Sequence, residues 1–95
     1  MSNGKSRRKG RDGELEVVHL IPGAKRVGYS FIKTIIDIDW PDGVAQVKNL
    51  SIGGTAMADI LADIAKSSPK KGYVIFKAKR GTWLICQSLK QFLGG

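Results

Sequence analysis

The chain has 95 residues, of which 42% are hydrophobic and 25% charged, a balance typical of one small globular domain rather than a disordered chain. No apolar run is long enough to cross a bilayer and no signal-peptide pattern opens the chain, so we expect a cytoplasmic protein without a membrane partner. Sixteen Lys and Arg residues against eight Asp and Glu give a net charge of +8, which favours a polyanion such as nucleic acid as the partner.

Residues 1–11 form the first predicted segment, a basic arm with no apolar side chain after Met1. This composition predicts a flexible segment that can lie along phosphates, and residues 12–95 then form the single folded domain. The predicted DNA contacts of the arm are its basic side chains, Lys5, Arg7, Arg8, Lys9 and Arg11.

Hydrophobic periodicity and turn signals predict the order α-β-β-β-α-β-β-α for the domain. The expected elements are a helix over 12–21, extended chain over 24–40, a strand over 44–50, an amphipathic helix over 55–68, strands over 73–79 and 83–87, and a short helix over 89–93 capped by Ser88. This order is most simply a three-layer α/β arrangement with a mixed sheet.

A hairpin is predicted around the Asp42-Gly43 pair, a strong two-residue turn signal. A turn there pairs Asp39 with Gln46 and Asp37 with Lys48. Strand alternation then places four polar side chains on one face of the hairpin, Asp37, Asp39, Gln46 and Lys48. The opposite, core-facing side receives Ile36, Ile38, Ala45 and Val47.

Glu14 lies within the apolar stripe of the first predicted helix, on the same face as Val17, Val18 and Ile21. Glu16 points the other way, to water. Because a carboxylate on a packed face costs free energy unless it is paired, we expect Glu14 to meet a cation, a metal or a hydrogen-bond network near Asp37 and Lys48.

Two or three carboxylates, an amide and a lysine at one place suit a hard cation, Mg²⁺ or Mn²⁺, and phosphodiester hydrolysis. The lysine would position or polarise the nucleophile. The same residues also fit a solvated hairpin face on a non-catalytic nucleic-acid-binding module, and the residues alone leave both interpretations open.

The chain resembles the PD-(D/E)xK nuclease superfamily over residues 5–93. The similarity lies in the opening "RRKGRDGELEVVHL" with its embedded glutamate, the Asp-x₈-Gln-x-Lys spacing from Asp37, and "KKGYVIFKAKRGTWLI" ahead of a C-terminal helix. Within the superfamily it is most similar to archaeal and phage-type Holliday junction resolvases. The resemblance implies a restriction-endonuclease-like fold and Mg²⁺- or Mn²⁺-dependent cleavage of four-way DNA junctions by a homodimer.

The resemblance also implies roles for single residues. Glu14 would order a metal-bound water, Asp37 would bind the metal, and Lys48 is the motif lysine. The backbone carbonyl of Val47 would be a further metal ligand, and Ser30 a contact to the substrate.

One departure from the family pattern concerns Gln46, which stands where most members carry Glu or Asp. A neutral amide binds a divalent cation less well than a carboxylate, although Mrr-type restriction endonucleases also carry Gln-x-Lys. Asp39 is therefore a further candidate metal ligand. A restriction-like or nicking nuclease acting on duplex DNA shares the same site and remains an alternative. The expected dimer interface draws on the second helix and the late strands, at Ile60, Ile64, Phe76 and Trp83.

Overall fold

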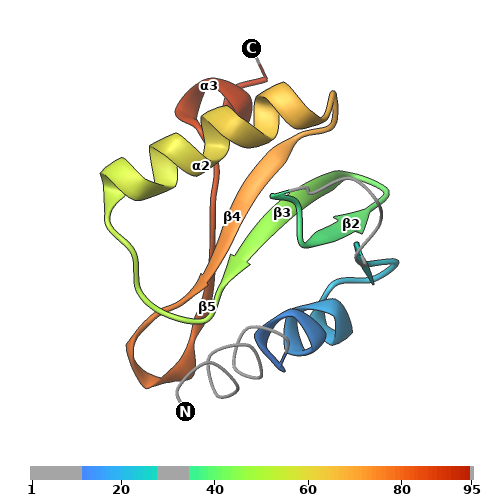
Figure 1. Ribbon diagram of the computed structural model, residues 1–95, viewed down its shortest axis with the longest axis vertical. Coiled ribbons are helices and arrows are strands. Elements are labelled where there is room, and N and C mark those ends of the chain that lie inside the picture. Colours follow the sequence, from blue (N-terminus) through green and yellow to red (C-terminus); the bar gives the residue numbers. More distant parts are fainter. Residues whose placement is uncertain (1–11, 28–34, 95) are drawn as a thin grey trace.

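The computed structural model describes residues 12–27 and 35–94, which form a five-stranded mixed sheet with helices on both faces (Figure 1). In chain order the elements are a helix at residues 12–20 (the N-terminal helix), β1 (Lys25–Arg26), β2 (Ile38–Trp40), β3 (Gly43–Lys48), α2 (Gly54–Ser67), β4 (Gly72–Lys77), β5 (Trp83–Cys86) and α3 (Leu89–Phe92). A short 3₁₀ turn, Lys79–Gly81, joins β4 to β5. The predicted α/β class and the predicted order of elements are therefore confirmed.

The strands lie in the sheet in the order of the sequence, β1-β2-β3-β4-β5. All neighbours are antiparallel except β3 and β4, which run parallel, with Val44 beside Gly72 and Lys48 beside Phe76. Parallel neighbours require a crossover connection, and α2 provides it. The connection lies close to the sheet, because a Cβ added at Gly72 would meet Ile64 of α2 at 2.6 Å.

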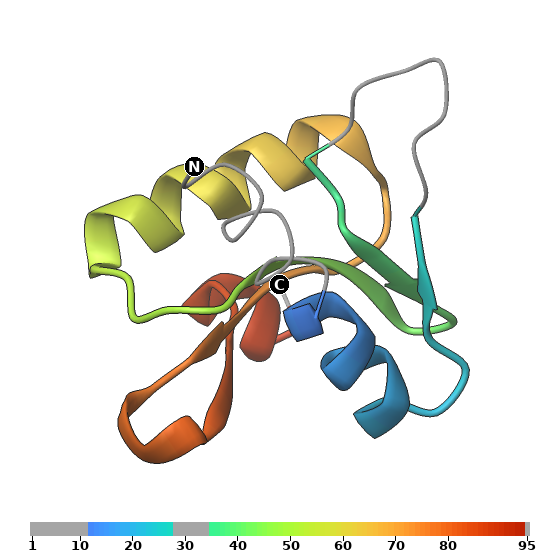
Figure 2. The same cartoon turned by 60° about the horizontal axis from the view of Figure 1, so that its bottom comes forward.

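Two apolar clusters lie on the two faces of the sheet. Figure 2 shows the N-terminal helix over one face and α2 over the other. Under the N-terminal helix, Val17 packs with side chains of the three central strands, Ile38, Ala45, Val47 and Ile75. Under α2, Ile64 packs with Ile36 and Val44. Ile64 is 0% exposed, so its predicted place in a dimer interface was wrong, because the side chain is buried in the core of its own chain.

The hairpin between β2 and β3 differs from the prediction by two residues in register. Trp40 pairs with Gly43 and Asp39 with Val44, so the turn consists of Pro41 and Asp42. The predicted pairing of Asp39 with Gln46, and with it that of Asp37 with Lys48, was wrong. A turn at Asp42-Gly43 would have put Pro41 into the ladder, where proline has no N–H to donate, whereas its fixed φ suits the first turn position.

Strand alternation breaks immediately before β2. The backbone N–H of Asp37 donates to the carbonyl of Ala45 at 2.9 Å, although the register partner of Ala45 is Ile38. Two consecutive residues thus face one, as in a β-bulge. As a result Ile36 packs under α2 while Ile38 packs under the N-terminal helix, and the prediction that both share one core face was wrong.

The C-terminal helix α3 is fixed by two polar side chains. Ser88 caps it as predicted, since its Oγ accepts a hydrogen bond from the N–H of Gln91 at 3.1 Å. The side-chain amide of Gln91 accepts from the N–H of Gly72 at 3.1 Å and donates to the carbonyl of Gly72 at 3.0 Å. The helix is thereby attached to the first residue of β4.

Candidate functional site

The carboxylate of Asp37 lies where the chain before β2 parts from β3. Its Oδ2 accepts a hydrogen bond from the backbone N–H of Val47 at 2.8 Å. In a regular ladder a backbone carbonyl of the neighbouring strand would accept such a bond. The bulge therefore replaces a main-chain acceptor with an ionisable side chain at the edge of the core.

Burial raises the pKa of Asp37 from its ordinary value of 3.8 to about 6. The hydrogen bond from Val47 opposes this shift, the negative charge of Glu14 adds to it, and the positive charges of Lys48 and Arg26 oppose it. These influences show that Glu14, Lys48 and Arg26 all lie close enough to Asp37 to act on its charge. The carboxyl is consequently poised to gain or lose a proton near neutral pH.

Glu14 approaches from the N-terminal helix and its side chain is only 18% exposed, as its place in the apolar stripe predicted. The expected compensating cation is Arg26, whose Nε lies 3.4 Å from the Glu14 Oε1. Arg26 was not identified from the sequence. Its position follows from the fold: Arg26 pairs with Ile38, which puts it on the face that the N-terminal helix covers, and no pattern in the sequence indicates this pairing.

Gln46 and Lys48 are both half-buried on β3. They flank Val47, whose side chain packs under the N-terminal helix, so alternation directs Gln46 and Lys48 to the α2 face. Lys48 nevertheless lowers the pKa of Asp37, because both stand where β2 and β3 part. The arrangement thus brings Glu14 and Lys48 to the same carboxyl from opposite faces of the sheet.

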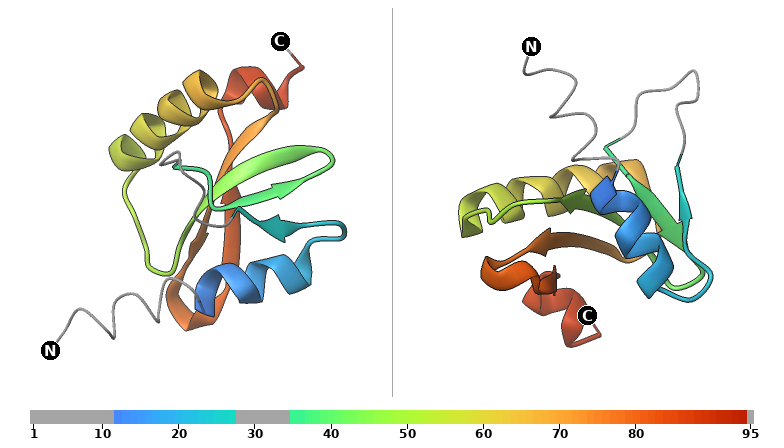
Figure 3. Two further views of the ribbon diagram at one scale, coloured as in Figure 1. Left: turned by 45° about the vertical axis from the view of Figure 1, so that its right-hand side comes forward. Right: turned by 90° about the horizontal axis from the view of Figure 1, so that it is seen from below.

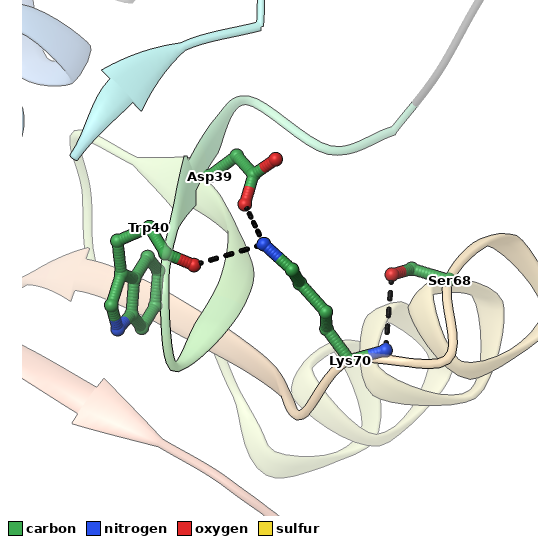
Figure 4. Close-up of polar contacts among 4 residues, drawn as sticks. All are labelled: Asp39, Trp40, Ser68 and Lys70. Atoms are coloured by element: carbon green, nitrogen blue, oxygen red, sulfur yellow. Dashed lines mark hydrogen bonds and ion pairs between the residues drawn. The ribbon is translucent and has the colours of Figure 1, made fainter. Parts of the chain in front are cut away.

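Asp39 occupies a different place from Asp37. Its Oδ1 lies 2.6 Å from the Nζ of Lys70, which also donates to the carbonyl of Trp40 at 3.1 Å (Figure 4). The backbone N–H of Lys70 donates in turn to Ser68 Oγ at 3.2 Å, so the ammonium extends from the end of the α2–β4 connection. Asp39 serves here to tie this connection to the hairpin, and the structure does not bring it to Asp37.

Glu16 is half-exposed, as predicted, but it is not free in water. The indole N–H of Trp83 donates to its Oε1 at 2.8 Å, and the Lys77 Nζ lies 3.6 Å from its Oε2. These two contacts lower the pKa of Glu16, with the Trp83 bond the larger influence, against a smaller opposing effect of burial. Lys77 also lies 5.2 Å from the Trp83 ring centroid. The group attaches the N-terminal helix to β4 and β5.

A metal ion at the candidate site would have to be held by few charged ligands. Within residues 12–27 and 35–94 no three His, Cys, Asp or Glu side chains come together to hold a metal ion. In the described part of the chain, Glu14 is the carboxylate whose charge acts on Asp37. Among the neutral groups, the backbone of Val47 contacts Asp37 directly, whereas strand alternation directs the Gln46 side chain to the α2 face, away from Glu14. Neutral oxygen atoms are a type of ligand that Mg²⁺ accepts together with water.

Some predicted site residues lie outside the described residues: Ser30 and the arm residues Lys5, Arg7, Arg8, Lys9 and Arg11.

Comparison of the chain with family models, curated proteins and solved structures found no match. In the described part of the chain, no helix has the length and apolar character needed to cross a bilayer.

Proposed function

We propose that this protein is a Mg²⁺- or Mn²⁺-dependent endonuclease with a restriction-endonuclease-like fold that resolves four-way DNA junctions in the cytoplasm. The observation that carries the proposal is the state of Asp37. A half-buried carboxyl with a pKa near 6, placed between Glu14 and Lys48, is a perturbed ionisable group beside a specific charge partner. Such groups concentrate at functional sites, because keeping them has a free-energy cost.

The site residues divide the work of hydrolysis as follows. Asp37 and Glu14 would hold the divalent cation, with the carbonyl of Val47 and the amide oxygen of Gln46 as neutral ligands. The bound cation would supply an activated water and would neutralise charge on the phosphate. Lys48 would place its ammonium against the scissile phosphate, where negative charge develops. Glu14 would orient the attacking water, and Arg26 would hold Glu14 in position.

The order and pairing of the elements support the same proposal. An antiparallel meander, a crossover helix and a parallel fourth strand follow a helix that carries the embedded glutamate. This order is compatible with the fold that the resemblance to the PD-(D/E)xK nucleases implies. Glu14 lies on the N-terminal helix, Asp37 immediately before β2 and Lys48 at the end of β3. The net charge of +8 supports a polyanionic substrate.

A four-way junction is resolved by cutting two opposed strands. Two identical active sites related by a two-fold axis meet that requirement, so the proposed enzyme is a homodimer. The same active site in a monomer would cut or nick ordinary duplex DNA instead, which is the alternative nuclease function.

A non-catalytic nucleic-acid-binding module is the second candidate. It is favoured by the absence of a third acidic or imidazole ligand near Asp37 among the described residues and by the neutral Gln46. The two functions differ in what Glu14→Gln does. An endonuclease variant would lose cleavage and keep DNA binding, whereas a binding module has no cleavage to lose.

The direct test is cleavage of labelled four-way junction, linear duplex and single-stranded DNA in Mg²⁺, Ca²⁺ and excess chelator. We expect symmetric cuts in the junction with Mg²⁺, binding without cleavage in Ca²⁺, and no cleavage with chelator. Equal cleavage in chelator would disprove the metal mechanism. Equal cleavage of junction and duplex would support the duplex nuclease instead of the resolvase. DNA binding without cleavage in any of the metals would support the non-catalytic nucleic-acid-binding module.

A further inference from the structure

The two edges of the sheet are built from opposite kinds of residue. At one edge β1 has two residues, Lys25 and Arg26, both exposed and basic. At the other edge β5 has four residues, Trp83–Cys86, none of them charged. An edge strand presents unpaired backbone groups, and short length and lysine side chains are common protections against pairing with another chain. By these criteria, within residues 12–27 and 35–94, β1 is protected and β5 is not.

Apolar side chains surround this unprotected edge. On β5 and the following helix α3, five large side chains are exposed by 43–71%: Leu84, Ile85, Leu89, Phe92 and Leu93. Beside them a groove of about 480 Å³ opens between α2, the sheet and α3, lined mainly by Met57, Phe76, Leu84, Cys86, Leu89 and Phe92. Figure 3 shows β5 and α3 together, away from the β2–β3 hairpin. We call β5, α3 and this groove the C-terminal apolar surface.

We propose that the C-terminal apolar surface binds a second copy of this chain, with β5 paired antiparallel to β5 of the partner. The symmetry of the strand edge selects this occupant, and charge restricts where two copies can meet. Copies that each carry +8 repel one another over most of their surfaces, and β5 is a strand without charge at which they can approach. A strand edge is also self-complementary under a two-fold axis, because antiparallel pairing satisfies the same backbone groups in both copies.

The size of the surface agrees with such a contact. If each of the five exposed side chains presents on the order of 100 Å², the surface amounts to roughly 500 Å² per copy, at the upper end of what a monomer normally leaves exposed. A standard interface buries about 800 Å² per partner, so the backbone of β5 and the polar rim would supply the remainder. The sheets of the two copies would join into one. This inference does not depend on the nuclease function, since it rests on the edge and its apolar surroundings alone.

The test measures the mass of the full chain in solution by light scattering and sedimentation over a range of concentrations. We expect the wild-type chain to be a dimer and Ile85→Lys to be a monomer, because the substitution adds a charge to the middle of β5. Leu20→Lys is the matched control: Leu20 is 63% exposed on the N-terminal helix, far in sequence from β5, and its replacement should leave the dimer intact.

Leu89→Lys on α3 is a second variant and keeps the test decisive if Ile85→Lys fails to fold, as judged by its circular dichroism. It should weaken the dimer at least tenfold without touching the strand. A wild-type monomer up to millimolar concentration would overturn the proposal. A dimer that survives both β5 and α3 substitutions, or that Leu20→Lys dissociates, would place the interface elsewhere and would equally overturn it.

Discussion

The two aspartates of the hairpin, two residues apart, show how differently one carboxyl group can be used. At the open end, where the strands part, Asp37 accepts a backbone hydrogen bond, is half-buried and has its pKa raised to about 6. At the turn end, Asp39 is 30% exposed and lies 2.6 Å from the ammonium of Lys70. The open end thus holds a carboxyl whose charge is unfavourable, and the turn end holds one whose charge has a direct partner.

The difference arises from the donor that each carboxyl meets. A single neutral N–H compensates only part of the cost of burying a charge, so Asp37 moves toward its neutral form. An ammonium in partial contact with water compensates the charge of Asp39 without burying it. We infer that the open end is organised for chemistry and the turn end for holding the fold together, and four substitutions test this division.

The largest effect is expected from Lys48, the lysine near Asp37. Under the proposed function, Lys48→Ala should reduce junction cleavage by about 10²–10³-fold, because the proposed donor to the developing charge is lost, while DNA binding changes little. Lys70→Ala is its matched control and should cleave within a few-fold of wild type. Single-turnover cleavage and filter binding measure the two quantities. A joint loss of binding and cleavage in Lys48→Ala would make this lysine a phosphate contact instead.

The next effect concerns packing at the turn end. A Cβ at Gly43 would meet the Tyr73 ring at 2.7 Å and the Lys71 carbonyl at 2.9 Å. Gly43→Ala should therefore lower the free energy of unfolding by about 2 kcal/mol, as overpacked sites do. Gly54→Ala, where nothing lies within 4 Å of the added atom, is the control and should be close to neutral. Urea denaturation measures the free energy of unfolding of both variants. Equal values for Gly43→Ala and Gly54→Ala would show that the Tyr73 ring moves aside at little cost.

Removing the charge at the open end should stabilise the protein. The Asp37 pKa is raised in the folded state, so its ionisation opposes folding: the penalty grows as pH rises from about 4 to 6 and is fully present above that range. The whole shift corresponds to about 3 kcal/mol, which contact with solvent reduces to about 1–2 kcal/mol. Asp37→Asn keeps an oxygen to accept the Val47 N–H and should gain this amount at pH 7.

The pH dependence of that gain identifies its cause. Asp37→Asn and wild type should have nearly equal free energies of unfolding below about pH 3.8, where the Asp37 carboxyl is mostly neutral in the folded and in the unfolded chain, and should diverge as the pH rises to about 6. Asp39→Asn provides the comparison and should show no such gain at pH 7. A destabilised Asp37→Asn at neutral pH would mean that the carboxylate is held by its cations more strongly than burial opposes it.

The smallest effect is expected from the ion pair at the turn end. Lys70→Met removes a pair between two partly exposed side chains and should cost less than about 1 kcal/mol in free energy of unfolding. The difference from wild type should shrink further in 1 M NaCl, because salt screens exposed charges. Thermal unfolding in low and high salt measures it, and a large loss that salt does not change would show that the hydrogen bond to the Trp40 carbonyl is the more important contact.

Much of this architecture could be predicted from the sequence because its signals are local. Periodicity places the N-terminal helix and α2, and Ser88 marks the start of α3 by its own hydrogen bond. The inward position of Glu14 also follows from helical spacing alone. These features depend on residues within a few positions of one another, so the order of elements needed no knowledge of packing.

The register of the hairpin and the surroundings of its aspartates could not be predicted in the same way. Gly43 was taken as a turn residue, whereas it is a strand residue kept free of a side chain by Tyr73, Lys71 and Trp40. The bulge at Asp37 and the partners Arg26 and Lys70 depend on chain segments brought together only by the fold. Lys70 is 31 positions from Asp39, and no pattern in the sequence links them.

The parallel pairing of β3 with β4 has a consequence for the speed of folding. The hairpin brings together residues 40 and 43, whereas Val44 meets Gly72 only after the intervening chain has closed a long loop that contains α2. Loop closure is an entropic barrier that non-local strand pairs must cross before their contacts repay it. We therefore expect the hairpin, with Asp37 already beside Val47, to form early and the β3–β4 ladder to limit the refolding rate. Val74→Ala, in the buried centre of β4, should then slow refolding in stopped-flow experiments, whereas an effect confined to unfolding would place this ladder after the rate-limiting step.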